Sequence, residues 1–257
     1  MPIASGLALS VVVAFFILVL ISPAAFLSYE RLLKALLSEE TRYALTLSLT
    51  TATASTVLSL VVSLPAAYAL SRYSFPGKSL AESLLDIPVS LPPVVLGACL
   101  LVFFARNPIG ALINEKLLPV IFSIPGIVVA QLAVITPITV RMLREVLEAV
   151  PPRYEWIART LGYTQLEAFL RVVLPLTKRG LLATVLLTWS RALGEFGATL
   201  MLAGATRLRT ETLPIMLYLK FSEGDFEGLV IAMYILIAIV ITTTLSTRVL
   251  LAKRLKA

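Results

Sequence analysis

The sequence is dominated by long runs that contain no charged side chain. Five of them cover residues 1–29, 43–71, 87–105, 117–140 and 228–247, and a sixth, 180–205, is interrupted only by Arg191 and Glu195. About 20 apolar residues in a helix cross a hydrocarbon core of about 30 Å. The first run is too long for a cleaved signal peptide, and no basic residue precedes it. We therefore expect an all-α membrane protein with six transmembrane helices in a single domain, 1–257. The predicted spans are residues 5–27, 43–71, 82–105, 117–142, 180–205 and 228–250.

Composition excludes several classes of protein. The chain is 58% hydrophobic and 14% charged, which is more apolar than a soluble domain of this length can cover. It contains no His, the commonest metal ligand and general base, and its one cysteine, Cys99, lies in an apolar run. The acids within or near the spans form no motif that places two carboxylates together. We therefore expect no catalytic residue, no metal site and no cofactor bound by this chain.

The basic residues predict the orientation of the chain in the membrane. One set of loops carries 13 of them, and the opposite set carries 8, matched by 8 acidic residues. Basic loop residues are concentrated on the cytoplasmic side of membrane proteins. The pattern therefore predicts a multi-pass protein of the cell membrane with both termini in the cytoplasm. It also assigns the net charge of +7 to membrane topology rather than to a nucleic-acid partner.

Prolines cluster in the third predicted span. Pro88, Pro92 and Pro93 all lie within residues 87–93. A proline removes a backbone donor and kinks its helix, which membrane helices tolerate where protein or water satisfies the freed groups. We expect a break in this span near a pathway, with Pro92 and Pro93 as candidate pathway or gate residues.

The segment between the fourth and fifth spans, residues 141–179, is too polar for lipid and too apolar for a flexible linker, and residues 151–175 within it form a predicted cytoplasmic segment of two short helices. Its prolines at 151 and 152 suit the start of a helix, which Gly162 can close. Thr164 and Glu167 have the spacing of a capping box, and Pro175 is expected to end the second helix. Tyr154, Ile157, Ala158 and Leu161 are expected to share one face of the first helix, and Leu166, Phe169, Leu170 and Val173 one face of the second. Such a helix pair can lie on lipid headgroups or dock into a groove of a cytoplasmic partner.

The same segment resembles the coupling-helix motif of ABC importer permeases. Ala158-Arg-Thr-Leu-Gly162 is followed, after nine residues, by Val172-Val-Leu-Pro175, which is the family's spacing. Trp156 and Ile157 stand where Glu and Ala are usual, and Glu155 lies one residue earlier. The resemblance implies the type I importer permease fold, with this loop seated on an ATPase subunit. The residues it implies for ATPase coupling are Glu155, Trp156, Ile157, Ala158, Arg159 and Gly162.

The chain carries no complete nucleotide-binding loop. Gly77-Lys78-Ser79 ends like a P-loop, but Arg72 occupies the position of its first glycine and no strand precedes it. We therefore expect ATP and Mg²⁺ to be bound by a separate ATPase chain, present in two copies. With six spans, the permease itself is expected to form a homodimer with the pathway on its axis.

Charges in the fifth span allow two interpretations. Arg191 and Glu195 are four residues apart and can form an ion pair that anchors helix packing, supported by neighbouring small residues. Alternatively they line a pathway together with hydroxyls such as that of Thr199, because charges at membrane depth usually face protein or water.

The run Ser190-Arg-Ala-Leu-Gly-Glu-Phe-Gly-Ala-Thr-Leu200 resembles the fifth-span signature of oxyanion importer permeases. Leu91–Gly97 and Thr210–Tyr218 resemble the molybdate branch more than the sulfate branch. The resemblance implies uptake of molybdate or tungstate by alternating access, with an extracytoplasmic oxyanion-binding protein as a further partner. The alternatives are a sulfate or thiosulfate permease of the same class and an ion-coupled secondary anion carrier that uses Glu195 as a proton site.

Overall fold

A computed structural model describes residues 2–26 and 34–252, and every regular element in these two ranges is helical. The elements are α1 (Pro2–Ile21), η1 (Ser22–Phe26), α3 (Glu39–Arg72), α4 (Lys78–Ser90), α5 (Pro93–Arg106), α6 (Pro108–Leu112), η2 (Ile113–Leu117), α7 (Ile124–Glu148), α8 (Arg153–Thr160), α9 (Gln165–Ala168), η3 (Phe169–Val173), α10 (Leu174–Leu193), α11 (Gly197–Ala203), α12 (Leu213–Ser222) and α13 (Phe226–Ala252). The predicted all-α class is confirmed. The end of the first predicted span at residue 27 and the charges of Arg31, Lys253, Arg254 and Lys256 lie outside the described residues.

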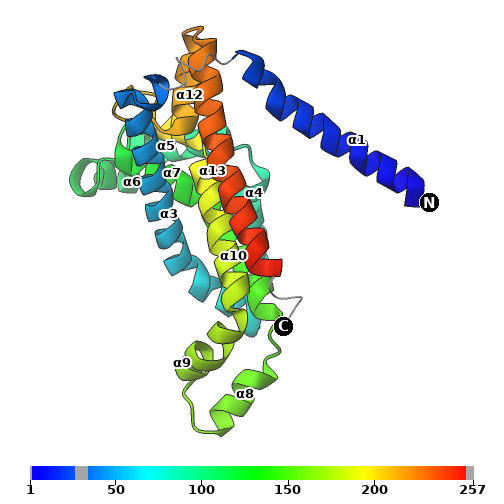
Figure 1. The fold of residues 1–257 in the computed structure, drawn as a ribbon. Coiled ribbons are helices and arrows are strands. Elements are labelled where there is room, and N and C mark those ends of the chain that lie inside the picture. The colour runs from blue at the N-terminus through cyan, green and yellow to red at the C-terminus, as the bar shows by residue number, and fades with distance from the viewer. Residues whose placement is uncertain (1, 27–33, 253–257) are drawn as a thin grey trace.

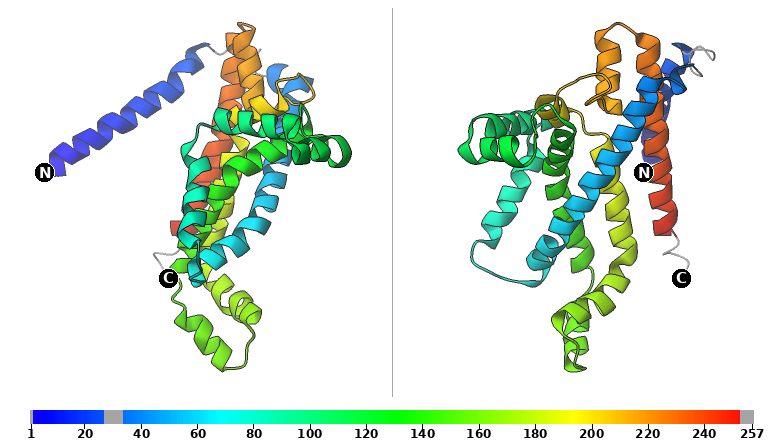
Figure 2. Two further views of the ribbon diagram at one scale, coloured as in Figure 1. Left: turned by 180° about the vertical axis from the view of Figure 1, so that it is seen from behind. Right: turned by 90° about the vertical axis from the view of Figure 1, so that its left-hand side faces the viewer.

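The described helices match the predicted spans with two interruptions. Four helices, in α1, α3, α7 and α13, are long and apolar enough to cross a membrane alone. The third predicted span is two helices, α4 and α5, bent by 109° at the proline cluster, so the predicted break is confirmed (Figure 2). The fifth predicted span is likewise divided, between α10 and α11. The break in the third span was expected, whereas the division of the fifth span was not.

Helix starts follow local capping signals. The side chain of Ser38 accepts a hydrogen bond from the backbone of Thr41, and two glutamates occupy the first turn of α3. Ser123 caps α7 in the same way through Gly126. The fourth predicted span therefore begins later than expected, at Ile124 rather than residue 117, because the chain before it forms a turn in which Phe122 has a positive φ of 52°.

The centre of the bundle is the pair α3 and α7, with α10 packed against both. Small and hydroxyl side chains let these helices approach closely, and the hydroxyls donate across the contact. Ser55 donates to the side chain of Gln131 at 2.7 Å, and Gln131 donates to the carbonyl oxygen of Ala192 on α10 at 3.1 Å. Gln131 is only 1% exposed, so its hydrogen bonds tie the three helices together at one point.

Two parts of the molecule project from this bundle. Figure 1 shows α1 running away from the long helices, with α8 and α9 extending beyond the opposite end of the bundle. The end of α1 is held by Tyr234 of α13, whose hydroxyl donates to the carbonyl oxygen of Leu20 at 2.9 Å. The side chains of α8 are therefore presented at an extremity of the molecule.

Candidate coupling segment and pathway

The end of α8 has the geometry of a glycine-terminated helix. Gly162 has a φ of +94°, and its N–H donates to the carbonyl oxygen of Arg159 at 3.0 Å. The N–H of Tyr163 donates to the carbonyl oxygen of Ala158 at 3.2 Å, which completes a Schellman motif. The prediction that Gly162 closes the first helix of this segment is confirmed.

The start of α9 is a complete capping box. The hydroxyl of Thr164 accepts from the N–H of Glu167 at 3.3 Å, and the Glu167 carboxylate accepts from the N–H of Thr164 at 2.9 Å. The hydrogen bonds from the Thr164 backbone and hydroxyl favour the ionised carboxylate and lower the pKa of Glu167. The predicted cap is therefore confirmed, and it fixes the direction in which the chain re-enters the bundle.

The predicted end of this second helix at Pro175 is wrong. From Gln165 to Leu193 the chain is helical without a break, because a π-helical turn, η3, joins α9 to α10. In this turn the N–H of Leu174 donates to the carbonyl oxygen of Phe169, five residues back. The wider turn accommodates the proline ring and the missing donor of Pro175, which an ordinary α-helix would not. The coupling segment is thus continuous with the fifth span.

The apolar side chains of α8 face outward. Of this helix only Glu155 and Ala158 are buried, whereas Trp156 is 65% exposed and Ile157 is 56% exposed. Of the expected common face, Tyr154, Ile157 and Leu161 are exposed, as a docking or headgroup-facing surface requires, and only Ala158 is buried. Arg159 and Gly162 are also exposed. The remaining exposed side chains, Tyr154, Leu161, Tyr163 and Leu166, extend the patch into an apolar tip.

Glu155 faces the bundle rather than the tip. Its carboxylate accepts from Arg72 of α3 at 2.5 Å and from the hydroxyl of Tyr68 at 2.6 Å. The Arg72 guanidinium also donates to the carbonyl oxygens of Leu147 and Val150 at the end of α7, at 3.0 Å and 2.9 Å. The resemblance implied a coupling role for Glu155, but sequence reasoning missed Arg72 and Tyr68, which lie more than 80 residues away in the chain.

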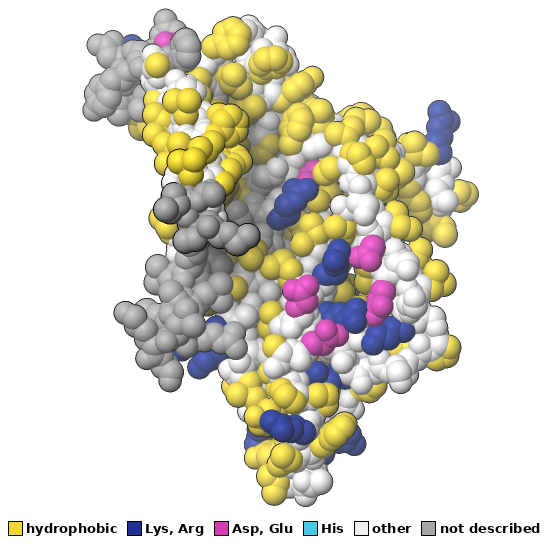
Figure 3. All heavy atoms as spheres, turned by 90° about the vertical axis from the view of Figure 1, so that its right-hand side faces the viewer, with side chains coloured by type: hydrophobic (Ala, Val, Ile, Leu, Met, Phe, Trp, Pro, Cys, Tyr) yellow, Lys and Arg dark blue, Asp and Glu magenta, His cyan; other side chains and the backbone are white. Residues whose placement is uncertain are grey.

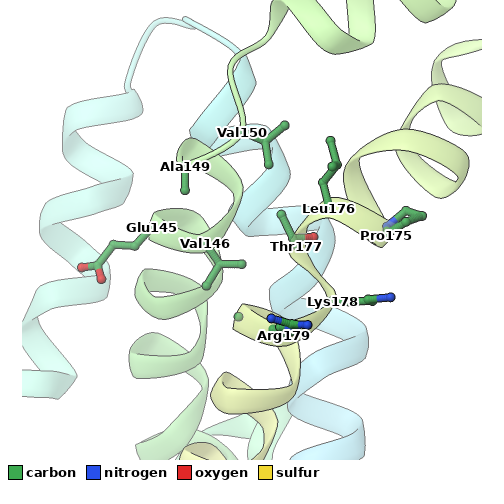
Figure 4. Close-up of a pocket in the computed structure, with 10 residues that line it drawn as sticks. Glu145, Val146, Ala149, Val150, Pro175, Leu176, Thr177, Lys178 and Arg179 are labelled. Carbon is green, nitrogen blue, oxygen red and sulfur yellow. The ribbon is translucent and has the colours of Figure 1, made fainter. Parts of the chain in front are cut away.

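A cavity of about 450 Å³ lies between the end of α7 and the start of α10 (Figure 4). Lys178 and Arg179 line it from α10, and the Glu145 side chain from α7 points away from them in Figure 4. Gly180 and Val146 also line it, and the two helices come close where they meet, since a Cβ at Gly180 would lie 2.8 Å from a methyl group of Val146. The cavity therefore opens a basic recess where the coupling segment joins the bundle.

The break between α10 and α11 is built around Glu195. One carboxylate oxygen accepts from Arg191 at 2.8 Å, and the other accepts from the N–H of Ala198 in the first turn of α11 at 2.9 Å. The Glu195 side chain is 1% exposed, whereas that of Arg191 is 37% exposed. A carboxylate at a helix N-terminus and an arginine at a helix C-terminus both suit the helix dipoles. This arrangement matches the structural interpretation of the pair.

The two broken spans meet at their breaks. A Cβ placed on Gly197 would lie 2.7 Å from the Val94 side chain and 3.4 Å from Cβ of Pro93. Of the pathway candidates, the structure thus brings Pro93 against the start of α11, while Pro92 is exposed. Thr199 is fully buried, and its hydroxyl has no hydrogen-bond partner among the described residues.

Charged side chains gather on one face of α4 and α7 (Figure 3). Arg141 pairs with Asp86 at 3.3 Å, and Arg144 pairs with Glu82 at 2.8 Å and with Glu148 at 2.7 Å. On α7 the charged positions 141, 144, 145 and 148 follow helical spacing and so form a single stripe. We call these side chains and their α4 partners the charged face.

Comparison with known proteins places this arrangement in a family. The family described as binding-protein-dependent transport system inner membrane component matches residues 59–257. The sulfate transport system permease protein CysW of Synechocystis is 35% identical, over 92% of this chain and 88% of that protein. The probable molybdenum ABC transporter permease protein of Haloferax volcanii is 38% identical, over 72% of this chain and 66% of that protein.

Solved structures share the fold. A bacterial alginate ABC transporter, in complex with its alginate-bound periplasmic protein, has a chain that is 13% identical. The two superpose with a TM-score of 0.73 over 96% of this chain and 95% of that one. The MetNI methionine ABC transporter gives a TM-score of 0.62 at 19% identity, over 84% of this chain and 99% of the other. The fold is thus the type I importer permease fold that the coupling motif implied, and the chain belongs to the family of binding-protein-dependent transport system inner membrane components.

Proposed function

We propose that this chain is the membrane-spanning subunit of an ATP-driven importer that moves a tetrahedral oxyanion into the cytoplasm by alternating access. The observation that carries the proposal is the exposed apolar tip of α8 at the far end of an apolar helical bundle. Exposed aromatic and aliphatic side chains on a short helix suit a groove on a partner protein. The partner proposed for this groove is an ATPase subunit, which binds ATP and Mg²⁺.

The remaining partners follow from the class of transporter. A second copy of the permease completes a two-fold assembly with two ATPase subunits, and an extracytoplasmic protein delivers the oxyanion. Both termini lie in the cytoplasm, as the basic loops predict. Alternating access then requires a two-state assembly whose equilibrium is biased by the binding protein outside and by ATP inside.

Sulfate is the first candidate substrate. The CysW relative, a sulfate permease, aligns over 88% of its own length, whereas the molybdenum relative aligns over 66%. This corrects the preference for molybdate or tungstate drawn from short segments, which becomes the second candidate. The ion-coupled carrier has less support, because both carboxylate oxygens of Glu195 already accept hydrogen bonds.

The test is reconstitution of the permease with its ATPase and binding protein in liposomes. We expect ATP hydrolysis and uptake to be stimulated by sulfate, with molybdate and tungstate assayed in parallel vesicles. Stimulation by molybdate or tungstate alone would reverse the order of the two candidates. Absence of stimulation by every oxyanion, or uptake driven by an ion gradient without ATP, would reject the proposal.

A further inference from the structure

The buried group formed by Arg72, Glu155 and Tyr68 lies between the coupling segment and the spans. The side chains of Arg72 and Glu155 are only 7% and 8% exposed. Their charges are thus removed from water and satisfied by one another and by neighbouring polar groups. We name these three side chains the α8 anchor.

The α8 anchor joins three helices at one guanidinium. Arg72 belongs to the last turn of α3, donates to two carbonyl oxygens at the end of α7, and pairs with Glu155 of α8. An arginine that makes several charge-assisted hydrogen bonds has a fixed orientation, so these helix ends cannot shift independently without breaking contacts.

Besides the anchor, α8 packs against η3 and α9. Its buried side chains are Glu155 and Ala158, and Trp156, the next residue after Glu155, is exposed on the tip. Successive residues of a helix are about 100° apart, so adjacent positions can face a partner and the bundle respectively. A force applied to the tip therefore reaches the spans through the connections at both ends of α8, through its packing on η3, and through Glu155, which leads directly to α3.

We infer that the α8 anchor is the positioning link that carries movement of α8 into α3 and α7. The inference rests on the proposed function, since it assumes an ATPase seated on the tip. Glu155 then acts inside the permease and not as a contact with the ATPase, although the resemblance grouped it with the residues for ATPase coupling. Movement of Glu155 pulls Arg72, and Arg72 transmits it to the two helices at the centre of the bundle.

The test uses the full assembly of permease, ATPase and binding protein in liposomes, supplied with the oxyanion that the wild type transports. Glu155→Gln keeps the side-chain size and removes its charge. We expect the ATPase to copurify as in the wild type, because the tip is untouched. The amount of oxyanion transported per ATP hydrolysed should fall about fivefold or more, the lower end of the usual range for coupling between distant sites.

Arg171→Gln is the matched control, because it breaks an exposed ion pair of the same segment, with Glu167 at 3.8 Å. It should leave the transport ratio unchanged. An unchanged ratio in Glu155→Gln would overturn the inference, since a merely structural role lowers the yield of assembled complex but not the ratio within it. If Glu155→Gln does not assemble, Tyr68→Phe decides, because it keeps the ring and the charge pair and removes the hydrogen bond to Glu155 at 2.6 Å, together with a longer one from Gln165 at 3.3 Å. In Tyr68→Phe, a fall in the oxyanion transported per ATP that is smaller than the fall expected for Glu155→Gln supports the link, and an unchanged ratio overturns it.

Failure of the proposed function would appear in the wild-type arm as an absence of transport. In that case amide hydrogen exchange of the permease alone tests the link. Glu155→Gln should speed exchange over residues 153–160, while Arg171→Gln should not. Equal exchange in the two variants would overturn the inference independently of transport.

Discussion

At Gly162 the backbone adopts a conformation that side chains with a Cβ rarely take, and nothing lies within 4 Å of where a Cβ would be added. The cost of Gly162→Ala is therefore conformational rather than steric, at about 1–2 kcal/mol for a left-handed residue. We expect faster amide exchange at the end of α8 in this variant, measured by mass spectrometry. Gly162→Asn is the control, because asparagine tolerates this conformation better. Equal exchange in the two variants would contradict the argument.

Glu211 is the most confined acidic residue on the side of the bundle opposite α8. It is 0% exposed, and its carboxylate accepts from the N–H of Leu208 at 2.9 Å. Burial raises the pKa of Glu211, and the nearby carboxylate of Glu40 on α3 raises it further, although the hydrogen bond from Leu208 and the charge of Arg207 oppose this. Glu40 itself is paired with Lys220 of α12 at 2.7 Å.

A raised carboxyl pKa makes the folded protein less stable as pH rises. Its contribution is fully present below the ordinary glutamate pKa and is lost as pH passes through the raised value. As pH rises from the ordinary glutamate pKa through the raised value, we therefore expect the melting temperature of the wild type to fall relative to that of Glu211→Gln. Melting curves of the purified protein at a series of pH values measure it. A difference that does not depend on pH would show that Glu211 ionises normally.

At the scale of elements, the contact between α5 and α11 depends on the absence of side chains. A Cβ on Gly97 would lie 2.6 Å from Cα of Ala198 and 2.8 Å from its carbonyl oxygen, and these backbone atoms cannot rotate away. Gly97→Ala should therefore force the two broken spans apart and lower stability by about 1–3 kcal/mol, as overpacking does. Gly6→Ala, with nothing within 4 Å, is the control. Melting temperatures that fall equally in both variants would contradict this packing.

Sequence predicted those elements whose signals are local. The caps at Gly162 and Thr164 depend on residues within one turn, so reading them needed no tertiary information. The prediction that Pro175 ends the helix was wrong because a π-helical turn precedes the proline and removes the steric clash of its ring. Residue spacing does not indicate such a turn. The partners of Glu155 could not be predicted, because the pairing depends on where α3 ends relative to α8. The sequence analysis treated the charges near Gly194–Phe196 as an interruption within one span and did not predict that α10 ends there and α11 begins.

For the whole molecule, the charged face restricts what can surround the bundle. Arg141 and Asp86 have side chains that are 55% and 56% exposed, within predicted spans. A charged side chain facing hydrocarbon costs about 2.5–3.5 kcal/mol on insertion scales. By contrast, the exposed part of α3 around Val61 and Val62 is apolar and suits lipid. The two sides of the bundle therefore require different surroundings, with water or protein beside the charged face.

Cysteine labelling can distinguish these surroundings. In a Cys99→Ser background, Arg141→Cys and Val62→Cys place single thiols about 10 and 15 Å from the nearer ends of α7 and α3, given 1.5 Å per residue. We expect a charged, membrane-impermeant maleimide added to inside-out vesicles to label Arg141→Cys, because water reaches the charged face. Val62→Cys should react only after detergent is added, because lipid covers that side. If neither thiol reacts in intact vesicles but both react in detergent, the charged face is sealed from water in the resting assembly. In that case protein, and not water, lies beside the charged face.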